Sequence, residues 1–237
     1  MRAETRHQLK QDKFRQATGD TVHWAAEHQR KLAMAGIAVV VLGAVILGTW
    51  YYFERQDRTA SVELGKAIRS YEMQVRPAGV PEQPDFPSFA SLAERAKAAH
   101  QQFQTIAGKY PHTKSGEIAL YFSGLTAMDL NDNASAERDL KKIASAHDQD
   151  LAALARFALA SVYRNTNRDT QAVELYKQLI DKPARTLSKA SAQLELASLY
   201  KAKQQGAEAR RLYEQIQKEN PNTEVASLAA SKLQEMK

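Results

Sequence analysis

LAMAGIAVVVLGAVILGTWYYF, residues 32–53, is a run of 22 residues without a charged side chain, and it decides the architecture of the chain. An α-helix rises about 1.5 Å per residue, so the run is long enough to cross the hydrocarbon core of a bilayer, about 30 Å thick. The run ends in Trp50–Phe53, and such aromatic clusters are typical of the membrane interface. The sequence therefore predicts one transmembrane helix.

A cleaved signal peptide is the first alternative for this run. The apolar core of a signal peptide has about 7–15 residues, whereas this run is longer and 31 residues precede it. Bulky Trp50–Phe53 stand where small residues would form a cleavage site. A buried helix of a soluble domain is the second alternative, but such helices are usually shorter. We therefore expect a retained anchor that crosses the membrane once.

The transmembrane helix divides the chain into a tail, an anchor and a large C-terminal domain. The predicted parts are the basic tail 1–31, the helix 32–53 and the domain 54–237, with a Pro-rich insert at about 76–90. Lys and Arg residues near the two ends of the helix are equal in number, four on each side. Arg30 and Lys31 abut the run directly, which favours a cytoplasmic N-terminus and a translocated domain. The reverse orientation, with the domain in the cytoplasm, stays open.

The overall composition excludes several classes of function. The net charge of +6 divides evenly between the tail and the domain, so the pI of 9.4 reflects diffuse charge and does not indicate nucleic-acid binding. The chain has no cysteine, which excludes disulfides and thiolate chemistry, and its six histidines are scattered. No phosphate-binding loop or nucleophile motif is present. We predict a protein that is not an enzyme and that binds no cofactor and no metal.

Two segments of the domain repeat one spacing of small and aromatic residues. The first contains Leu159-Ala160-x-x-Tyr163, followed by Ala172, Tyr176, Leu179 and Pro183. The second contains Leu196-Ala197-x-x-Tyr200, followed by Ala209, Tyr213, Ile216 and Pro221. In both, a Tyr lies 3 residues, an Ala 12 and a second Tyr 16 after the first small residue. This spacing predicts pairs of packed helices, in which small residues allow close approach and aromatic residues fill the space between.

Two weaker copies precede these segments. One contains Gly124, Ala136, Leu140 and Ile143. The other is split, with Leu64-Gly65 and Ile68 on its first helix and Ala99, Phe103, Ile106 and Pro111 on its second. About 22 extra residues, including four prolines, separate these two helices.

The pattern resembles the tetratricopeptide repeat, whose consensus has Leu-Gly-x-x-Tyr on the first helix and Ala, an aromatic residue and Pro on the second. The resemblance covers about residues 58–221, although the consensus Trp is missing. It implies an all-α fold, in which the transmembrane helix precedes an α-solenoid of three to four helix pairs. Residues 223–236 are then expected to form a terminal capping helix. A plain helical bundle is the alternative.

The layout of the whole chain is similar to that of the bacterial family of the ancillary Sec translocon subunit. This resemblance depends on the order of the tail, anchor, split repeat and later repeats, and on the stretch Phe103–Tyr121. It implies a single-pass inner-membrane protein with a periplasmic repeat domain. The implied partners are translocon subunits, periplasmic chaperones or unfolded secretory chains. The alternative is a scaffold for another envelope complex, in outer-membrane biogenesis, division or respiratory complex maturation, and the oligomeric state stays open.

A partner-binding surface is expected on the concave wall of the solenoid, which the first helix of each pair lines. Repeat positions 5, 9 and 12 on this wall are Tyr121, Leu125 and Met128, then Phe157, Ser161 and Arg164, then Leu194, Ser198 and Lys201. Apolar and aromatic side chains beside basic ones would suit an extended or helical peptide. The alternative is that several of them pack internally or against the Pro-rich insert.

Two other motifs have simpler explanations. Asp129–Asn133 begins like a calcium loop, but Ala134 and Leu140 replace the Gly and Glu that such a loop needs, which favours an ordinary turn. Pro81-x-x-Pro84-x-x-Pro87 resembles a polyproline ligand, but a stiff spacer is more typical of such a run.

Overall fold

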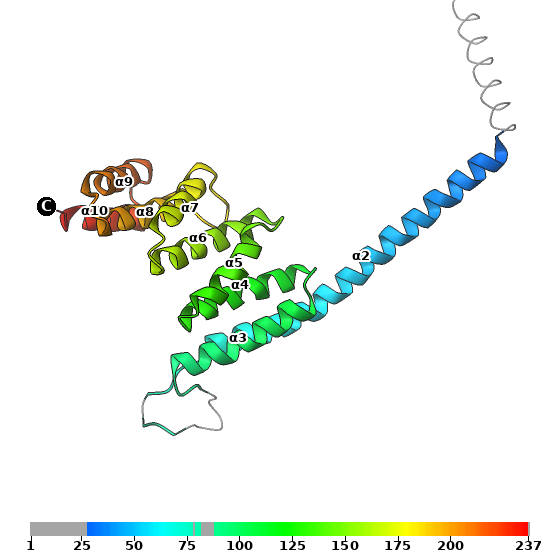
Figure 1. Cartoon of the computed structure of the whole chain (residues 1–237), viewed down its shortest axis with the longest axis horizontal. Coiled ribbons are helices and arrows are strands. Elements are labelled where there is room, and N and C mark those ends of the chain that lie inside the picture. The colour runs from blue at the N-terminus through cyan, green and yellow to red at the C-terminus, as the bar shows by residue number, and fades with distance from the viewer. Residues whose placement is uncertain (1–27, 78, 82–87, 237) are drawn as a thin grey trace, which may run out of the picture. The chain divides into compact units, whose positions relative to one another are not determined.

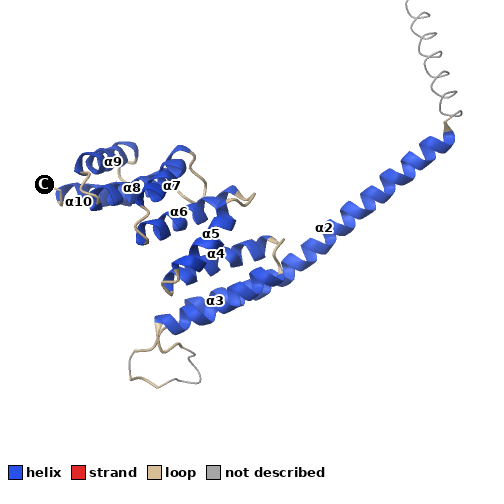
Figure 2. Cartoon of the chain, in the orientation of Figure 1, coloured by secondary structure: helices blue, strands red, loops and turns tan. Residues whose placement is uncertain are grey.

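A computed structural model describes residues 28–77, 79–81 and 88–236 of the chain (Figure 1). Residues 1–27 of the predicted tail and the middle of the Pro-rich insert, with Pro84, Phe86 and Pro87, lie outside these residues. The chain divides into two compact units, Met1–Glu54 and Arg55–Lys237. The regular structure of the described residues is helical (Figure 2), and the second unit has the expected all-α solenoid.

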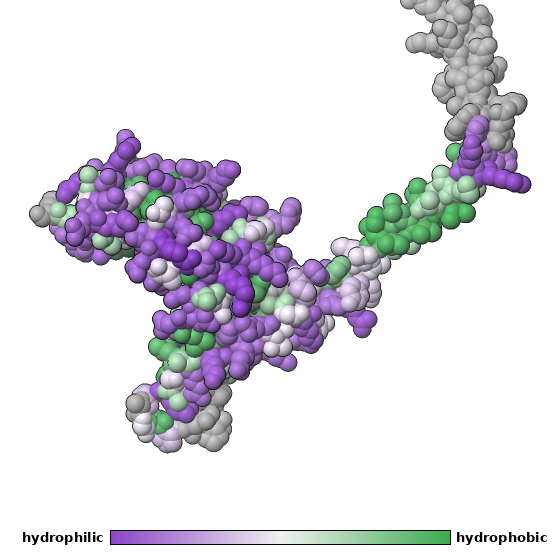
Figure 3. Space-filling view, in the orientation of Figure 1, coloured by the Kyte–Doolittle hydropathy of each residue, from purple (hydrophilic) through white to green (hydrophobic). Residues whose placement is uncertain are grey.

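The apolar run lies in helix α2, Gln29–Glu72. An 18-residue window of this helix has a mean hydropathy of 2.5, and none of the window is buried. Val40, for example, is 71% exposed, and the apolar surface forms a continuous band on α2 in Figure 3. Thr49 satisfies its hydroxyl within the helix by donating to the Val45 carbonyl at 2.7 Å. By length and composition, α2 is a candidate membrane span.

Helix α2 also continues beyond the predicted anchor. The anchor expected at 32–53 and the first helix of the repeats, expected around Leu64, lie in one helix of 44 residues. The segment from Glu54 to Leu64 contains no Gly or Pro, and several of its residues favour helix, so nothing in it ends the helix.

The repeat domain contains four helix pairs and a final helix. The end of α2 precedes α3 (Leu92–Lys109), and the following helices are α4 (Lys114–Asp129), α5 (Asn133–Ala144), α6 (Gln149–Asn165), α7 (Asp169–Asp181), α8 (Lys189–Ala202), α9 (Gly206–Glu219) and α10 (Glu224–Gln234). Each helix from α3 onward packs against the next one, and the first helices also meet, α4 with α6 and α8 with α10. This arrangement confirms the solenoid with a C-terminal capping helix.

One turn recurs inside the helix pairs. Asn131, Asn167 and Gln204 adopt left-handed backbone conformations with φ near 60° at equivalent positions. In each case the next residue donates its N–H to a carbonyl five residues earlier, as Asp132 does to Ala127 at 2.9 Å. This bond satisfies a carbonyl at the end of the first helix and turns the chain toward the second.

The repeated small and aromatic residues form the core. Ala160, Ala172 and Tyr176 are buried in the central cluster, and Tyr213 and Ile216 are buried in the C-terminal one. These are the residues whose spacing predicted the repeats, so the structure confirms that they fill the space between paired helices.

Two glycines that the sequence assigns to the same repeat position differ in the structure. A Cβ added at Gly124 would lie 2.6 Å from Cγ of buried Leu140, so only Gly allows this approach of α4 to α5. A Cβ at Gly65 would meet only a guanidinium nitrogen of Arg69, at 3.7 Å. The first copy therefore packs through buried Ala60, Leu64 and Ala67 and not through Gly65.

Candidate protein-binding surface

The nine side chains predicted to bind a partner lie three each on α4, α6 and α8, and all nine are half-buried. We call the surface formed by these nine residues the inner wall. A half-buried side chain packs against the core on one side and is accessible to solvent, or to a partner, on the other. The structure thus places the residues on first helices, as expected, while their role in binding stays a prediction.

On α4, the inner wall is apolar. Tyr121, Leu125 and Met128 pack against the central core cluster. The Tyr121 ring meets Phe122 edge-on at a centroid distance of 5.6 Å, and burial raises the pKa of its hydroxyl. This third of the wall offers an uncharged surface.

On α6, the inner wall changes from aromatic to charged. The Phe157 ring meets Tyr176 of α7 edge-on at 5.8 Å, and Ser161 donates to the Phe157 carbonyl at 3.5 Å. Arg164 forms an ion pair with Glu195 of α8, with 2.8 Å between Nη1 and Oε2. The pair connects consecutive first helices.

On α8, the polar members of the inner wall are also engaged. Ser198 lies 3.4 Å from the hydroxyl of Tyr213, and Lys201 forms a 2.8 Å ion pair with Glu235 at the end of α10. Leu194 packs against the C-terminal cluster. Sequence reasoning missed Glu195 and Glu235, because each belongs to a different helix from the cation that it binds.

One buried polar group lies behind the inner wall. The Tyr176 hydroxyl is fully buried and has no hydrogen-bond partner among the described residues. Burial raises the pKa of this hydroxyl, while the nearby Ser161 and Arg164 act to lower it. The phenol is therefore kept neutral beneath the polar end of the wall on α6.

The acidic turn after α4 has structural roles. Asp129 accepts a hydrogen bond from the Tyr71 hydroxyl at 2.6 Å, which joins α2 to α4, and burial together with this bond raises the pKa of Tyr71 to about 12. Asp132 caps α5 by accepting from the Ser135 N–H at 3.0 Å. In the described part of the chain, no three His, Asp or Glu side chains are grouped so that they could hold a metal ion.

The base of the Pro-rich insert is held together by backbone bonds. Arg76 donates its N–H to the Phe89 carbonyl at 2.9 Å, and the Phe89 N–H donates to the Gln74 carbonyl at 3.0 Å. The Arg76 side chain adds a bond to the Ser88 carbonyl at 2.8 Å. These contacts fix the ends of the insert beside α2 and α3.

The comparisons with known proteins agree with this geometry. The family model described as a tetratricopeptide repeat-like domain matches residues 22–175, and a tetratricopeptide repeat model matches residues 191–223. A similar solved structure is the crystal structure of a candidate kinesin light chain from Podosopora anserina with nearly identical TPR-like repeats, which was solved as a point variant. It is 18% identical, covers 76% of this chain and 85% of its own, and superposes with a TM-score of 0.57, so it shows the fold alone. The comparison with curated proteins found no match. Since the first model covers more than half of the sequence, the chain belongs to the family of tetratricopeptide repeat-like domains.

Proposed function

We propose that this protein is a membrane-anchored adaptor, which is held at a bilayer by Leu32–Phe53 and binds protein partners on the inner wall. Tetratricopeptide repeats indicate a protein–protein interaction scaffold, and the fold is typical of proteins that are not enzymes. The observation that carries the proposal is the coexistence of an apolar segment that nothing in the described protein covers and a repeat domain with a half-buried apolar wall.

The exposed segment of α2 supports the anchor. Its side chains between Val39 and Leu47 include aliphatic residues more than half exposed, which would be unfavourable in water. Trp50 and Tyr51, also more than half exposed, would suit the lipid interface. An anchor concentrates the repeats at the membrane surface, so moderate affinity suffices for capture of a partner.

The inner wall supports binding of a peptide segment. Its apolar residues on α4 would contact apolar side chains of the partner, whereas Arg164 and Lys201 lie in ion pairs that are partly open to solvent. Such pairs contribute little to stability, about 0–1 kcal/mol, so an acidic group of a partner could replace Glu195 or Glu235 at small cost.

We place the adaptor in the bacterial inner membrane, with its N-terminus in the cytoplasm and its repeats in the periplasm. The resemblance of the layout to the ancillary Sec translocon subunit supports this placement, as do Arg30 and Lys31 next to the apolar run. The partners proposed are translocon subunits, periplasmic chaperones or secretory chains that emerge from the translocon.

Site-specific photo-crosslinking in native membranes tests the function. A photoreactive residue replaces Phe157 on the inner wall, and the control replaces exposed Glu174 on α7. The proposal expects translocon subunits, chaperones or secretory precursors to be captured from position 157 only. Capture of one other envelope complex would indicate an assembly scaffold instead, and equal capture from both positions would remove the inner wall as the site.

The orientation has a separate test. A reporter enzyme that is active only in the periplasm is fused after Lys237. Activity is expected, and its absence, with activity of a cytoplasmic reporter at the same position, would reverse the topology.

A further inference from the structure

The first helix of the repeat domain carries a basic face that the proposed function does not use. Arg55, Arg58, Val62, Lys66 and Arg69 are all exposed on α2, and Val62 is 60% exposed. At about 100° per residue they fall within an arc of about 80°, opposite the buried residues of the same helix. We call these five residues the outer face of α2.

Two acidic residues between Arg55 and Arg69, Asp57 and Glu63, are engaged in contacts inside the domain. Asp57 accepts the Ser115 N–H at 2.8 Å at the start of α4. Glu63 accepts from Lys109 at 2.8 Å and from the Tyr110 hydroxyl at 2.9 Å, and these bonds hold the pKa of Glu63 below its usual range. The 80° arc of the outer face thus contains four cations and Val62, and no acidic residue.

Lys66 and Arg69 differ from the cations between the later repeats. Within residues 28–77, 79–81 and 88–236, no ion pair involves either of them, whereas Arg164, Arg168 and Lys203 are each paired with a carboxylate on another helix. Like charges at i,i+3 and i,i+4 destabilise a helix by about 0.2–0.5 kcal/mol per pair. Lys66 and Arg69 therefore lack the ion pairs that connect the later repeats, although the Lys66 charge helps to lower the pKa of Glu63.

Gly65 borders the outer face and has no role in the packing of the domain. A glycine inside a helix costs roughly 0.5–1 kcal/mol relative to Ala, and the space around Gly65 would accept a larger side chain. A glycine beside a charged, exposed face lets another backbone come close to the helix. This observation is independent of the charges, and it also points to a partner.

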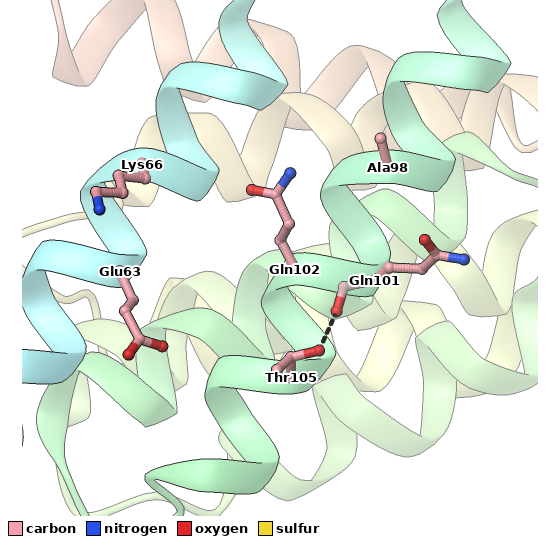
Figure 4. A pocket seen from close by; sticks show the side chains of 6 residues that line it. All are labelled: Glu63, Lys66, Ala98, Gln101, Gln102 and Thr105. Atoms are coloured by element: carbon pink, nitrogen blue, oxygen red, sulfur yellow. Dashed lines mark hydrogen bonds between the residues drawn. The ribbon is translucent and has the colours of Figure 1, made fainter.

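A groove continues the surface onto α3. Its volume is about 410 Å³, and Figure 4 shows Glu63 and Lys66 on one side and Ala98, Gln101, Gln102 and Thr105 on the other. The groove lies on the edge of the solenoid at which a preceding repeat would pack. Polar side chains border the groove, but much of its exposed surface is apolar, as suits contact with another helix.

We propose that the outer face of α2 docks an acidic amphipathic helix of a partner protein. Carboxylates along one side of such a helix would meet Arg55, Arg58, Lys66 and Arg69, with an apolar residue against Val62 and close backbone approach at Gly65. Spacings of three and four residues along the face are those by which two helices pair. The proposal concerns a different surface from the inner wall and does not depend on it.

Anionic lipid head groups are the rival partner, because Arg55 follows the apolar run by two residues. The face extends about 21 Å along α2 from Arg55 to Arg69. Contact with lipid head groups gives no reason for the close backbone approach that Gly65 allows. A helical protein partner accounts for the four cations and for Gly65.

The test uses the full chain in phosphatidylcholine nanodiscs and a fluorescent helical peptide of about three heptads. The peptide carries Glu along one face and a single Leu at its centre, and the control peptide carries Gln in place of Glu. Anisotropy is measured at low and high salt for the protein, for Lys66→Glu/Arg69→Glu, for Gly65→Leu and for a charge-matched control, Lys142→Glu/Lys177→Glu. The control reverses two exposed lysines on α5 and α7.

The proposal expects salt-sensitive binding of the Glu peptide and weaker binding of the Gln peptide. The Lys66/Arg69 variant should bind at least about tenfold more weakly, and the charge-matched control should change by less than about twofold. Gly65→Leu should weaken binding without lowering the thermal midpoint. Equal loss in both double variants, or unchanged binding in Gly65→Leu, would overturn the proposal. So would binding of phosphatidylglycerol vesicles that only Arg55→Glu/Arg58→Glu abolishes, because it would identify a lipid surface.

Discussion

The two ends of the repeat domain differ in how their terminal helix faces are kept from exposing apolar surface. A solenoid exposes an apolar face at each end unless something covers it. At the C-terminal end, α10 covers the cluster of Ala209, Tyr213 and Ile216 with Ala229 and the side chains around it. At the N-terminal end nothing among the described residues covers α2 from outside, and its outer face consists of four cationic side chains and Val62. The C-terminal end is covered by a helix that buries its apolar side chains. The N-terminal end carries charged side chains instead and stays accessible to a partner.

Removal of the C-terminal cover should have the largest effect on stability. A stop codon after Asn222 deletes α10 and exposes Tyr213 and Ile216, which are now fully buried. Each large apolar side chain that is re-exposed costs about 1.5–3 kcal/mol, so we expect a loss of at least about 3 kcal/mol in the free energy of unfolding. Urea denaturation measures it, and hydrogen exchange should show lost protection in α8 and α9. An unchanged midpoint would mean that α10 does not cap the solenoid.

Alanine substitutions at Gly124 and Gly65 should have opposite effects on stability, because Gly124 lies in the core and Gly65 lies at the uncovered N-terminal end of the domain. Gly124→Ala places a methyl group against Leu140, and overpacking of this kind costs about 1–3 kcal/mol. Gly65→Ala meets open space and should stabilise the domain by about 0.5–1 kcal/mol through helix propensity. Thermal unfolding of the two variants measures both changes. Destabilisation by Gly65→Ala would show that Gly65 is also part of the internal packing.

A partly exposed ion pair between Glu137 and Arg168 should make the stability of the domain depend on pH. Arg168 donates to both oxygens of Glu137, at 2.9 and 2.6 Å, and this bond lowers the pKa of Glu137 from 4.5 to about 2. A lowered pKa in the folded state means that the stabilisation is present above pH 4.5 and is lost as the pH falls toward 2. Glu137→Gln should lower the stability at pH 7, and this cost should shrink as the pH falls through about 2, where folded Glu137 becomes protonated. Urea titrations at several pH values test this, and an equal cost at every pH would exclude the charge as its source.

Replacing cations on the outer face of α2 by neutral side chains should have the smallest effect on stability. Lys66→Gln/Arg69→Gln removes like charges from the outer face of α2, so we expect a gain of about 0.2–0.5 kcal/mol at low salt and no change at high salt. The matched pair Lys142→Gln/Lys177→Gln should change stability by less. A clear loss of stability in the first variant would reveal an internal partner for these cations.

The repeated spacing was sufficient to predict the later repeats. Leu159, Ala172 and Tyr176, with their counterparts Leu196, Ala209 and Tyr213, are buried as expected, because intervals that bring small and aromatic residues together on paired helices leave few other arrangements. Thr113 and Thr223, which begin the helices after the two similar Pro turns, both cap them through their hydroxyls. Local chemistry of this kind is visible in one sequence.

The sequence could not predict the contacts between repeats. Whether Arg164 faces a partner or Glu195 depends on the rotation of α8 against α6, which no spacing within one helix determines. Gly65 occupies the consensus position of a repeat, yet α2 packs through other residues, because the split copy retains little of the repeat's first-helix pattern. The cationic face of α2 was present in the sequence as a spacing of three and four residues, and recognising it required the helix to be seen as one continuous element.

The left-handed turn at Asn131, Asn167 and Gln204 also bears on the history of the domain. The three pairs from α4 to α9 all leave their first helix in the same conformation and enter their second in the same direction. A duplication or deletion whose two breakpoints both fall at this turn would therefore exchange one module for another and preserve the backbone on both sides. Such a domain can change its length by unequal recombination, while its two differing ends remain as they are.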